Sequence, residues 1–432
     1  MFTNYTESGT PLLTDPDART TASFLLERTT TTIANTIRRC ILTETRSAGF
    51  RADLTNQADP GVKIRRNTSV IFNEMLAHRL TLLPLGVRRL DEFEPTRYEC
   101  VLRIKNDRRG PITPENILHV RAGDFVVRER GGDGTMADLP PAAAAAMFPA
   151  DPITRDTALL VSLRPQWSPE QPAEEIDLTA FPVIGRGRDH MGFCPVSQCS
   201  FANTPDPDPV RQERFFHAWL ADYKKISDPA AGAGATPEQL VAHRAEWETM
   251  AAQRCFLVDE RGQPNSFSFT VESVGIRPVQ EIVAEGIRAA ADLVAPFAEA
   301  AERPAKELGI TVHPTDSRMS NAVDLTFSDQ EHTLGNLLQT TITELFLDAE
   351  AADSPITYCG YKVPHPLERK MRLRIGVREG AKGEPGAIAL QAVATAAAKA
   401  RALFDDLGRS WAGLTGVATA AAAPAAAPEL DG

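Results

Sequence analysis

Cysteine is scarce in this chain. Only six cysteines occur among 432 residues, and they are scattered without the dense spacing of a disulfide framework. The closest pair, Cys194 and Cys199, has no second pair beside it. We therefore interpret these thiols as buried strand cysteines and predict no metal site. The scarcity excludes a disulfide-stabilised secreted domain and indicates a reducing compartment.

Long apolar runs and an excess of basic residues are also missing. No apolar stretch approaches the ~20 residues of a spanning helix, and residues 1–19 lack the basic and apolar regions of a signal peptide. Neither membrane insertion nor secretion is therefore predicted. With 57 acidic against 46 basic side chains the net charge is -11, the wrong sign for a protein that mainly neutralises nucleic-acid phosphates. We expect its partners to be proteins.

Catalytic motifs are absent as well. The sequence has no Walker loop, no nucleophile elbow, no zincin helix and no cluster of aspartates that would hold magnesium. Residues 185–192 are rich in glycine, but a proline-containing segment follows them instead of an apolar helix, which is the wrong context for a phosphate-binding loop. We expect no independent enzyme activity and no cofactor.

What the sequence does contain is a mixture of alternating and helical apolar patterns, which predicts an α+β fold. The segments with strand patterns are 22–26, 266–274, 321–327, 357–363 and 371–375, with a sheet-rich region over 98–163. The segments with helical patterns are 33–42, 67–80, 279–302, 332–347 and 387–407.

An internal repeat organises these segments. Residues 32–37 resemble residues 333–338, and at the same offset Phe24 of the preceding strand falls on Leu325. A second strand and a long helix follow each copy, so the unit strand-helix-strand-helix occurs twice, with a long insertion in the first copy. Two such units could pack on each other as an intramolecular pseudo-dimer. Chance similarity between short apolar patterns explains the repeat alone equally well.

These patterns divide the chain into six parts. In order they are an N-terminal extension (1–21), a first unit in two pieces (22–51 and 262–302), an inserted sheet-rich domain with an irregular peripheral region at 203–253 (52–261), a linker (303–320), a second unit (321–410) and an Ala/Pro-rich tail (411–432). The composition of the tail predicts disorder.

Two sets of motifs resemble known subunits. Residues 331–338 (EHTLGNLL) and 361–367 (YKVPHPL) resemble the smaller alpha-like subunit of eukaryotic and archaeal RNA polymerases. Residues 34–39 (ANTIRR), 74–85 (EMLAHRLTLLPL) and 269–275 (FTVESVG) resemble the larger alpha-like subunit. The resemblance runs, with gaps, from about residue 22 to about residue 407. A fusion of the two is similar to those of large cytoplasmic DNA viruses.

The resemblance implies a non-catalytic assembly platform of a DNA-directed RNA polymerase. Its implied partners are the two large catalytic subunits and small zinc-bearing accessory subunits, with DNA reached only through the complex. It implies a location in the host cytoplasm or nucleus, with packaging in the virion as a further expectation. The interface residues that it implies are Asn35, Arg38, Arg39, His78, Arg79, Glu272, His332, Thr333, Leu334, Gly335, Asn336, Tyr361, His365 and Pro366.

Some alternatives stay open at this point. The pair Arg38 and Arg39 is expected to reach toward a large subunit, but a solvated helix face would look the same. His332 and His365 are interpreted as structural because no cysteine or carboxylate cluster accompanies them. The four-cysteine zinc loop that many larger alpha-like subunits carry, and the iron-sulfur array of some archaeal relatives, are missing. A competing function is a nucleic-acid-binding regulator that would use the basic residues of 63–66 and 108–109.

Overall fold

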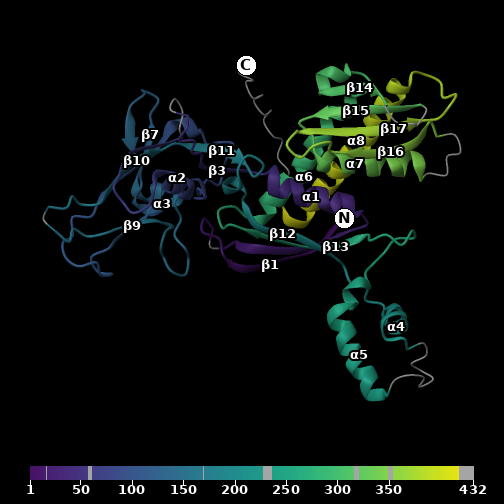
Figure 1. Cartoon of the computed structure of the whole chain (residues 1–432), viewed down its shortest axis with the longest axis horizontal. Coiled ribbons are helices and arrows are strands. Elements are labelled where there is room, and N and C mark those ends of the chain that lie inside the picture. Colours follow the sequence, from purple (N-terminus) through teal and green to yellow (C-terminus); the bar gives the residue numbers. More distant parts are fainter. Residues whose placement is uncertain are drawn as a thin grey trace.

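The computed structural model describes residues 1–15, 17–56, 61–168, 170–226, 236–315, 321–348 and 354–417. The Ala/Gly run at 230–235, the end of the expected linker and most of the expected tail lie outside these residues. Figure 1 shows a central body of two sheets with helices between them, a second sheet-rich body to one side and a helical hairpin that projects away from both.

The first unit is a four-stranded antiparallel sheet with two helices. Its strand order is β1-β2-β13-β12, and the inward side chains of its central strands, such as Phe24 and Phe269, pair across the sheet and are buried. The strands are β1 (Phe2–Pro11), β2 (Arg19–Glu27), β12 (Val196–Asn203) and β13 (Ser266–Ser273), and the helices are α1 (Thr31–Thr43) and α6 (Val279–Val294).

The second unit repeats this arrangement. Its sheet has the order β14-β15-β17-β16, so each strand has a counterpart at the same place in the first sheet, and Leu325 pairs with Leu373 as Phe24 pairs with Phe269. The repeat predicted from the sequence is therefore present in the fold. The strands are β14 (Ile310–Pro314), β15 (Ala322–Ser328), β16 (Ile356–Lys362) and β17 (Lys370–Val377), and the helices are α7 (His332–Ile342) and α8 (Pro385–Thr415).

The structure corrects several expected boundaries, mostly at sheet edges. Residues 1–21 are not an extension, because they supply β1 and the start of β2, and the segment expected as a linker supplies β14. Both strands lie at the edge of a sheet and expose most of their side chains, so the apolar alternation that marks a strand is nearly absent. β12, assigned to the inserted domain, completes the first sheet.

A second, separate core lies in the residues between α1 and β12. Its five-stranded sheet has the order β4-β10-β5-β7-β8, and two short two-stranded ladders adjoin it, β3 with β11 and β6 with β9. The strands are β3 (Arg46–Phe50), β4 (Val62–Asn67), β5 (Tyr98–Lys105), β6 (Leu118–Arg121), β7 (Val126–Arg130), β8 (Met136–Asp138), β9 (Leu159–Leu163), β10 (Glu175–Ala180) and β11 (Pro182–Arg186), and the helices are α2 (Asn73–Thr81) and α3 (Pro141–Met147).

The helix expected over 67–80 is shorter than its pattern. α2 begins at Asn73, and residues 62–67 form β4. Among the apolar residues of 67–80, Leu76 is buried, but Val70 and Met75 are exposed. The apolar residues that precede the helix, such as Val70, made the predicted helix too long at its N-terminal end.

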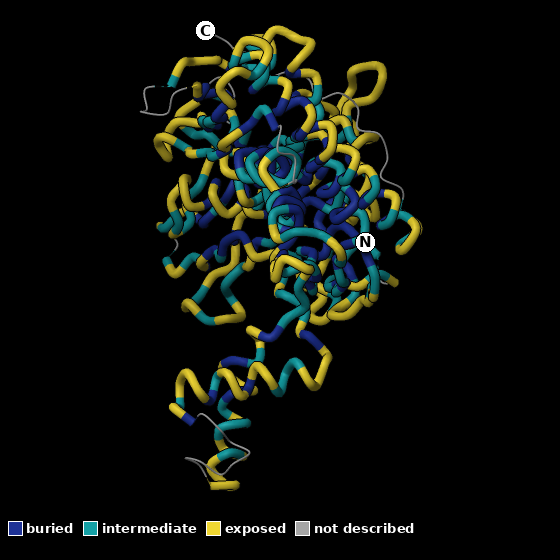
Figure 2. The backbone as a smooth tube through the Cα atoms, turned by 90° about the vertical axis from the view of Figure 1, so that its right-hand side faces the viewer, coloured by how far each residue is buried: buried dark blue, intermediate teal, exposed yellow. Residues whose placement is uncertain are grey.

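The region expected to be irregular at 203–253 is largely helical. α4 (Pro209–Trp219) and α5 (Pro237–Met250) form a hairpin that stands clear of the rest of the molecule in Figures 1 and 2. A small cluster that includes Phe216, Leu220 and Trp247 holds it together. Short 3-10 turns and π-helical turns complete the fold at Pro95–Arg97, Ala122–Asp124, Met191–Phe193, Leu220–Lys224, Ala252–Arg254, Ala295–Glu299, Ala305–Leu308 and Thr343–Leu347.

α8 is 31 residues long and, by length and composition, apolar enough to cross a membrane, which the sequence argument had not anticipated. A core helix passes the same test, so this is weak support for a span. One face of α8 is buried against α6, α7 and β1. Its alanine-rich composition is therefore explained by the close packing of helices around it.

One buried ion pair makes the second sheet sensitive to pH. Asp324 on β15 is buried and accepts two hydrogen bonds from Arg374 on β17, at 2.6 and 2.8 Å. These bonds lower the pKa of the Asp324 carboxyl. A carboxyl with a lowered folded-state pKa adds stability above its unfolded pKa of ~3.9, and that stability is lost as the pH falls through the folded value.

We predict that Asp324→Asn lowers the free energy of unfolding at pH 7 by roughly 2–3 kcal/mol, less than a fully buried pair because Arg374 keeps some exposure. Urea unfolding from pH 7 to pH 3 should show the difference from wild type shrink below about pH 4. The control is Asp177→Asn, whose two arginine partners are exposed and which should cost less than about 1 kcal/mol. A difference that stays constant with pH would contradict the assignment.

Candidate assembly interface

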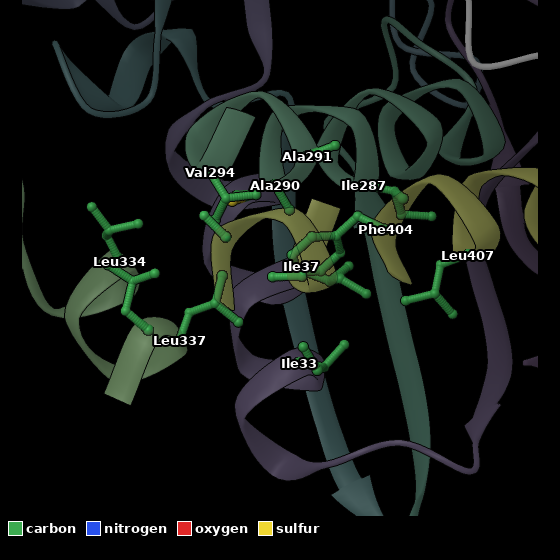
Figure 3. Close-up of a cluster of buried hydrophobic side chains, with 14 of the residues drawn as sticks. Ile33, Ile37, Ile287, Ala290, Ala291, Val294, Leu334, Leu337, Phe404 and Leu407 are labelled. Carbon is green, nitrogen blue, oxygen red and sulfur yellow. The ribbon is translucent and has the colours of Figure 1, made fainter. Parts of the chain in front are cut away.

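The two units share one hydrophobic core. Ile33 and Ile37 of α1 pack with side chains of α6, α7 and α8 in a continuous cluster, and Figure 3 shows Leu337 of α7 and Phe404 of α8 facing them. The helices approach closely: a Cβ on Gly286 of α6 would lie 2.4 Å from the Ile41 side chain. Any other residue at Gly286 would push α1 and α6 apart. The apolar faces of the four helices thus meet between the two sheets.

One aromatic side chain from each unit packs against the sheet of the other unit. Trp411, near the end of α8, is buried against the first sheet, with its ring centroid 4.8 Å from that of Phe24 and 5.0 Å from that of Phe2. In return, Phe297, just after α6, lies 5.3 Å from Phe327 of the second sheet. The indole Nε1 of Trp411 also donates a 3.0 Å hydrogen bond to the Gln280 carbonyl of α6. Each unit therefore completes the core of the other.

Two polar contacts between α1 and α7 follow the repeat. Arg39 Nε donates to Thr333 Oγ1 at 2.6 Å, and the hydroxyls of Thr32 and Thr340 lie 3.1 Å apart. The offset that aligns the repeats places Thr32 on Thr333 and Arg39 on Thr340. Each contact is therefore the image of the other, as in an isologous dimer interface, where the same surface patch is used twice. Asn336 adds a 3.4 Å hydrogen bond to Thr32.

The other interface residues implied by the resemblance fall into two groups. One group surrounds α1 and α7: Leu334 is buried in the shared core, the Arg38 guanidinium donates to Asn35 Oδ1 at 2.9 and 3.0 Å, and a Cβ on Gly335 would lie 2.4 Å from the Tyr361 ring. His332 Nδ1 lies 3.4 Å from the hydroxyl of the same tyrosine. The second group lies apart from these helices: Glu272 on β13, His78 and Arg79 on α2, and His365 and Pro366 on the β16–β17 loop.

Arg38 and Arg39 take different directions, which the sequence could not show. Arg39 donates a hydrogen bond to Thr333 of the second unit, whereas Arg38 donates its hydrogen bonds to Asn35 of its own helix. The expectation that both reach toward a large subunit therefore needs correction for Arg39, whose Nε serves the contact between the units. Arg38 remains the candidate for an outside partner.

Sequence reasoning missed the two aromatic residues that cross between the units. Trp411 was placed at the start of the tail and Phe297 was treated as part of a long helix. A signal for Trp411 was available, because Phe404, Leu407 and Trp411 recur at helical spacing and extend the apolar face of α8 to Thr415. Phe297 offered no comparable signal, because a 3-10 turn breaks the helical period before it.

The cysteines are poorly suited to metal binding. All six are buried and free. Cys199 lies in β12, as predicted for a strand cysteine, but Cys194 lies at the end of a 3-10 turn before that strand. Burial raises the pKa of Cys100, Cys199 and Cys359 to about 12, so these thiols stay protonated at neutral pH and are weak ligands. Within the part of the chain that the structure describes, no group of three or more His, Cys, Asp or Glu side chains could hold a metal ion.

Three of the five basic residues considered for nucleic-acid binding make contacts within the chain. Arg65 pairs with Asp177 at 3.2 Å, and Arg66 pairs with Glu175. Arg108 donates to the carbonyls of Glu115 and Ile117. These contacts leave less charge available for phosphates and weigh against a nucleic-acid-binding regulator.

Comparisons with known proteins agree with this geometry. Residues 23–293 and residues 322–410 each match a family described as the RNA polymerase Rpb3/Rpb11 dimerisation domain. The chain is 30% identical over 303 residues to DNA-directed RNA polymerases I and III subunit RPAC1 of Saccharomyces cerevisiae, covering 63% of this chain and 81% of that protein.

Two further relatives match a similar share of the chain. DNA-directed RNA polymerase II subunit RPB3 of Schizosaccharomyces pombe is 27% identical, covering 63% of this chain and 80% of its own length. DNA-directed RNA polymerase subunit Rpo3 of the archaeon Aeropyrum pernix is 24% identical, with coverage of 62% and 87%.

We predict that Trp411→Ala lowers the free energy of unfolding by about 3–5 kcal/mol, because it leaves a cavity between α8 and the first sheet. Leu414→Ala, on the same helix at a partly exposed position, should change it by less than about 1 kcal/mol. Urea denaturation followed by circular dichroism measures both. Equal effects of the two substitutions would show that Trp411 does not couple the units.

Proposed function

Because the chain belongs to the family of the RNA polymerase Rpb3/Rpb11 dimerisation domain, we propose that it is the non-catalytic assembly platform of a DNA-directed RNA polymerase. The observation that carries the proposal is the presence of two such domains in one chain, packed around one core. The three relatives named above are each one polymerase subunit, and each match covers 62–63% of this chain. Here the second domain follows on the same polypeptide.

In this proposal the chain is a fusion of the larger and smaller alpha-like subunits, and its two units form a pseudo-dimer within one molecule. The mirrored contacts of Arg39 with Thr333 and of Thr32 with Thr340 support this. So do the reciprocal positions of Trp411 and Phe297. A preformed pair needs no second chain to complete its core, so its folding does not depend on protein concentration.

The platform acts by binding other polymerase subunits. We place the two large catalytic subunits on it, with Arg38 on the outer side of α1 as one contact, and small zinc-bearing accessory subunits beside them. DNA is reached only through the assembled enzyme. The viral origin, the location in host cytoplasm or nucleus and the packaging in the virion rest on the resemblance of the fusion to those of large cytoplasmic DNA viruses.

We predict that Arg38→Glu lowers co-purification of the large catalytic subunits at least tenfold, while the melting temperature of the isolated chain stays within a few degrees. A reversed charge at a partner-facing site costs about 2–5 kcal/mol of binding, whereas the hydrogen bonds that the change removes among the described residues are those to Asn35. Arg39→Glu should lower both stability and assembly, because it removes the contact with Thr333.

The control is Arg214→Glu, at an exposed position on the projecting hairpin, which should change neither quantity. The measurement is affinity purification of the tagged chain from cells that co-express the large subunits. Normal assembly of the Arg38→Glu variant combined with slow nucleotide addition would contradict the scaffold role and point to a direct role near the active centre.

A further inference from the structure

The second sheet has one face that points away from the shared core. Its inward side chains, such as Leu325 and Leu373, are buried against the helices. Side chains alternate along a strand, and residues paired across a ladder share a face, so the register places the remaining side chains together on the opposite side. Figure 1 shows this sheet on the far side of the central body from the second sheet-rich body. The opposite side, which we call the outer face, includes Asp324 of β15, Arg372 and Arg374 of β17, and Tyr358, Gly360 and Lys362 of β16.

The four strands of this sheet are basic. They contain a single acidic residue, Asp324, and the basic residues His313, Lys362, Lys370, Arg372 and Arg374. The matching strands of the first sheet have the opposite balance, with the acidic residues Glu7, Glu27 and Glu272 and the basic residue Arg19. Both sheets share one architecture. The positive charge of the second sheet is therefore not a requirement of the fold.

Carboxylates within the described residues neutralise only part of this charge. Arg374 donates two hydrogen bonds to Asp324, at 2.6 and 2.8 Å. Glu368 of the β16–β17 loop pairs with Lys370 at 3.5 Å. Arg372 Nη1, in contrast, lies 3.8 Å from Asp324, which is beyond hydrogen-bond distance, and its side chain is 36% exposed. The excess of positive charge is therefore centred on Arg372.

An aromatic ring lies beside this charge. Tyr358 is 42% exposed, and a Cβ on Gly360 would lie 2.4 Å from the tyrosine hydroxyl oxygen. The ring thus lies across Gly360, and a larger residue at that position would displace it. The next residue of β16 on the same face, Lys362, is exposed and pairs in register with Arg372. The outer face therefore presents a ring next to two cations on a sheet.

We propose that the outer face of the second sheet binds a single strand of nucleic acid, with phosphates on Arg372 and Lys362 and a base stacked on Tyr358. Basic side chains that follow the backbone, together with an aromatic ring that accepts any base, are how proteins bind single strands. A duplex keeps its bases stacked inside, and an acidic peptide has no planar group to cover the ring. The net charge of -11 opposes binding over the whole surface, whereas this positive charge is confined to one face. The site goes beyond the assembly role and does not depend on it.

The test is fluorescence anisotropy of the full chain with labelled oligouridine of about 12 nucleotides, within the usual site size. Lys362→Glu should weaken binding at least about tenfold, because it reverses the charge at a phosphate contact. The matched control is Lys63→Glu, the same charge change at an exposed strand lysine of the second core, which should weaken binding less than about twofold. Tyr358→Ala should weaken binding at least about fivefold, whereas Tyr358→Phe, which keeps the ring, should not. The melting temperatures of the variants should stay within a few degrees of wild type.

Four results would overturn the proposal. They are no binding by the wild-type chain, equal weakening by Lys63→Glu, an unchanged affinity of Tyr358→Ala, and tighter binding of a duplex or of an oligoglutamate peptide than of the single strand. Equal weakening by Lys63→Glu would mean that binding follows net charge alone, and tighter peptide binding would identify an acidic protein segment as the occupant. RNA and DNA single strands are compared to identify the source: tighter binding of RNA indicates a contact with the 2′-hydroxyl, and equal affinities assign recognition to phosphates and bases. Both support the site.

Discussion

The constraint on which the whole structure depends is that neither unit can bury its own apolar surface. Each sheet has one apolar face and two helices, and the helices present more apolar surface than one sheet covers, so α1, α6, α7 and α8 must meet in a common core. Trp411 and Phe297 make this dependence specific, because each fills space on the sheet of the other unit. A platform that must hold larger subunits in fixed positions gains rigidity from such shared packing.

The shared core also determines where binding surfaces can lie. The apolar faces of the four helices are buried in the shared core. Other proteins can therefore bind only to surfaces outside it, such as the outer side of α1, the surface of the second core and the β16–β17 loop. Arg38 lies on α1, and Arg369 of the second unit lines one cavity together with His78 and other residues of the second core. A chain whose second unit separated from the rest would therefore lose this cavity.

How far the sequence predicts this structure depends on how strongly each residue is tied to a local pattern. The central strands β2, β13, β15 and β17 were predicted because their buried faces alternate, whereas the edge strands β1 and β14 carry little alternation. The interface residues, too, were predicted only in part. Thr333 and Asn336 were recognised from their motif as interface residues. That Thr333 accepts a hydrogen bond from Arg39 could not be predicted, because the two residues lie 294 positions apart in the chain. The course of α8 past Leu407 was missed because Gly408 follows directly, and a glycine at that place is a common signal for the end of a helix.

The most direct test of the central claim, that the two units pair within one chain, is a disulfide between Thr32→Cys and Thr340→Cys. The hydroxyl oxygens of these residues lie 3.1 Å apart, within reach of a disulfide after small adjustments, and burial keeps the native thiols unreactive. Mild oxidation should give a monomer with a reductant-sensitive shift on a denaturing gel and two fewer alkylatable thiols. Disulfide-linked dimers, or two freely alkylated cysteines, would contradict pairing within the chain.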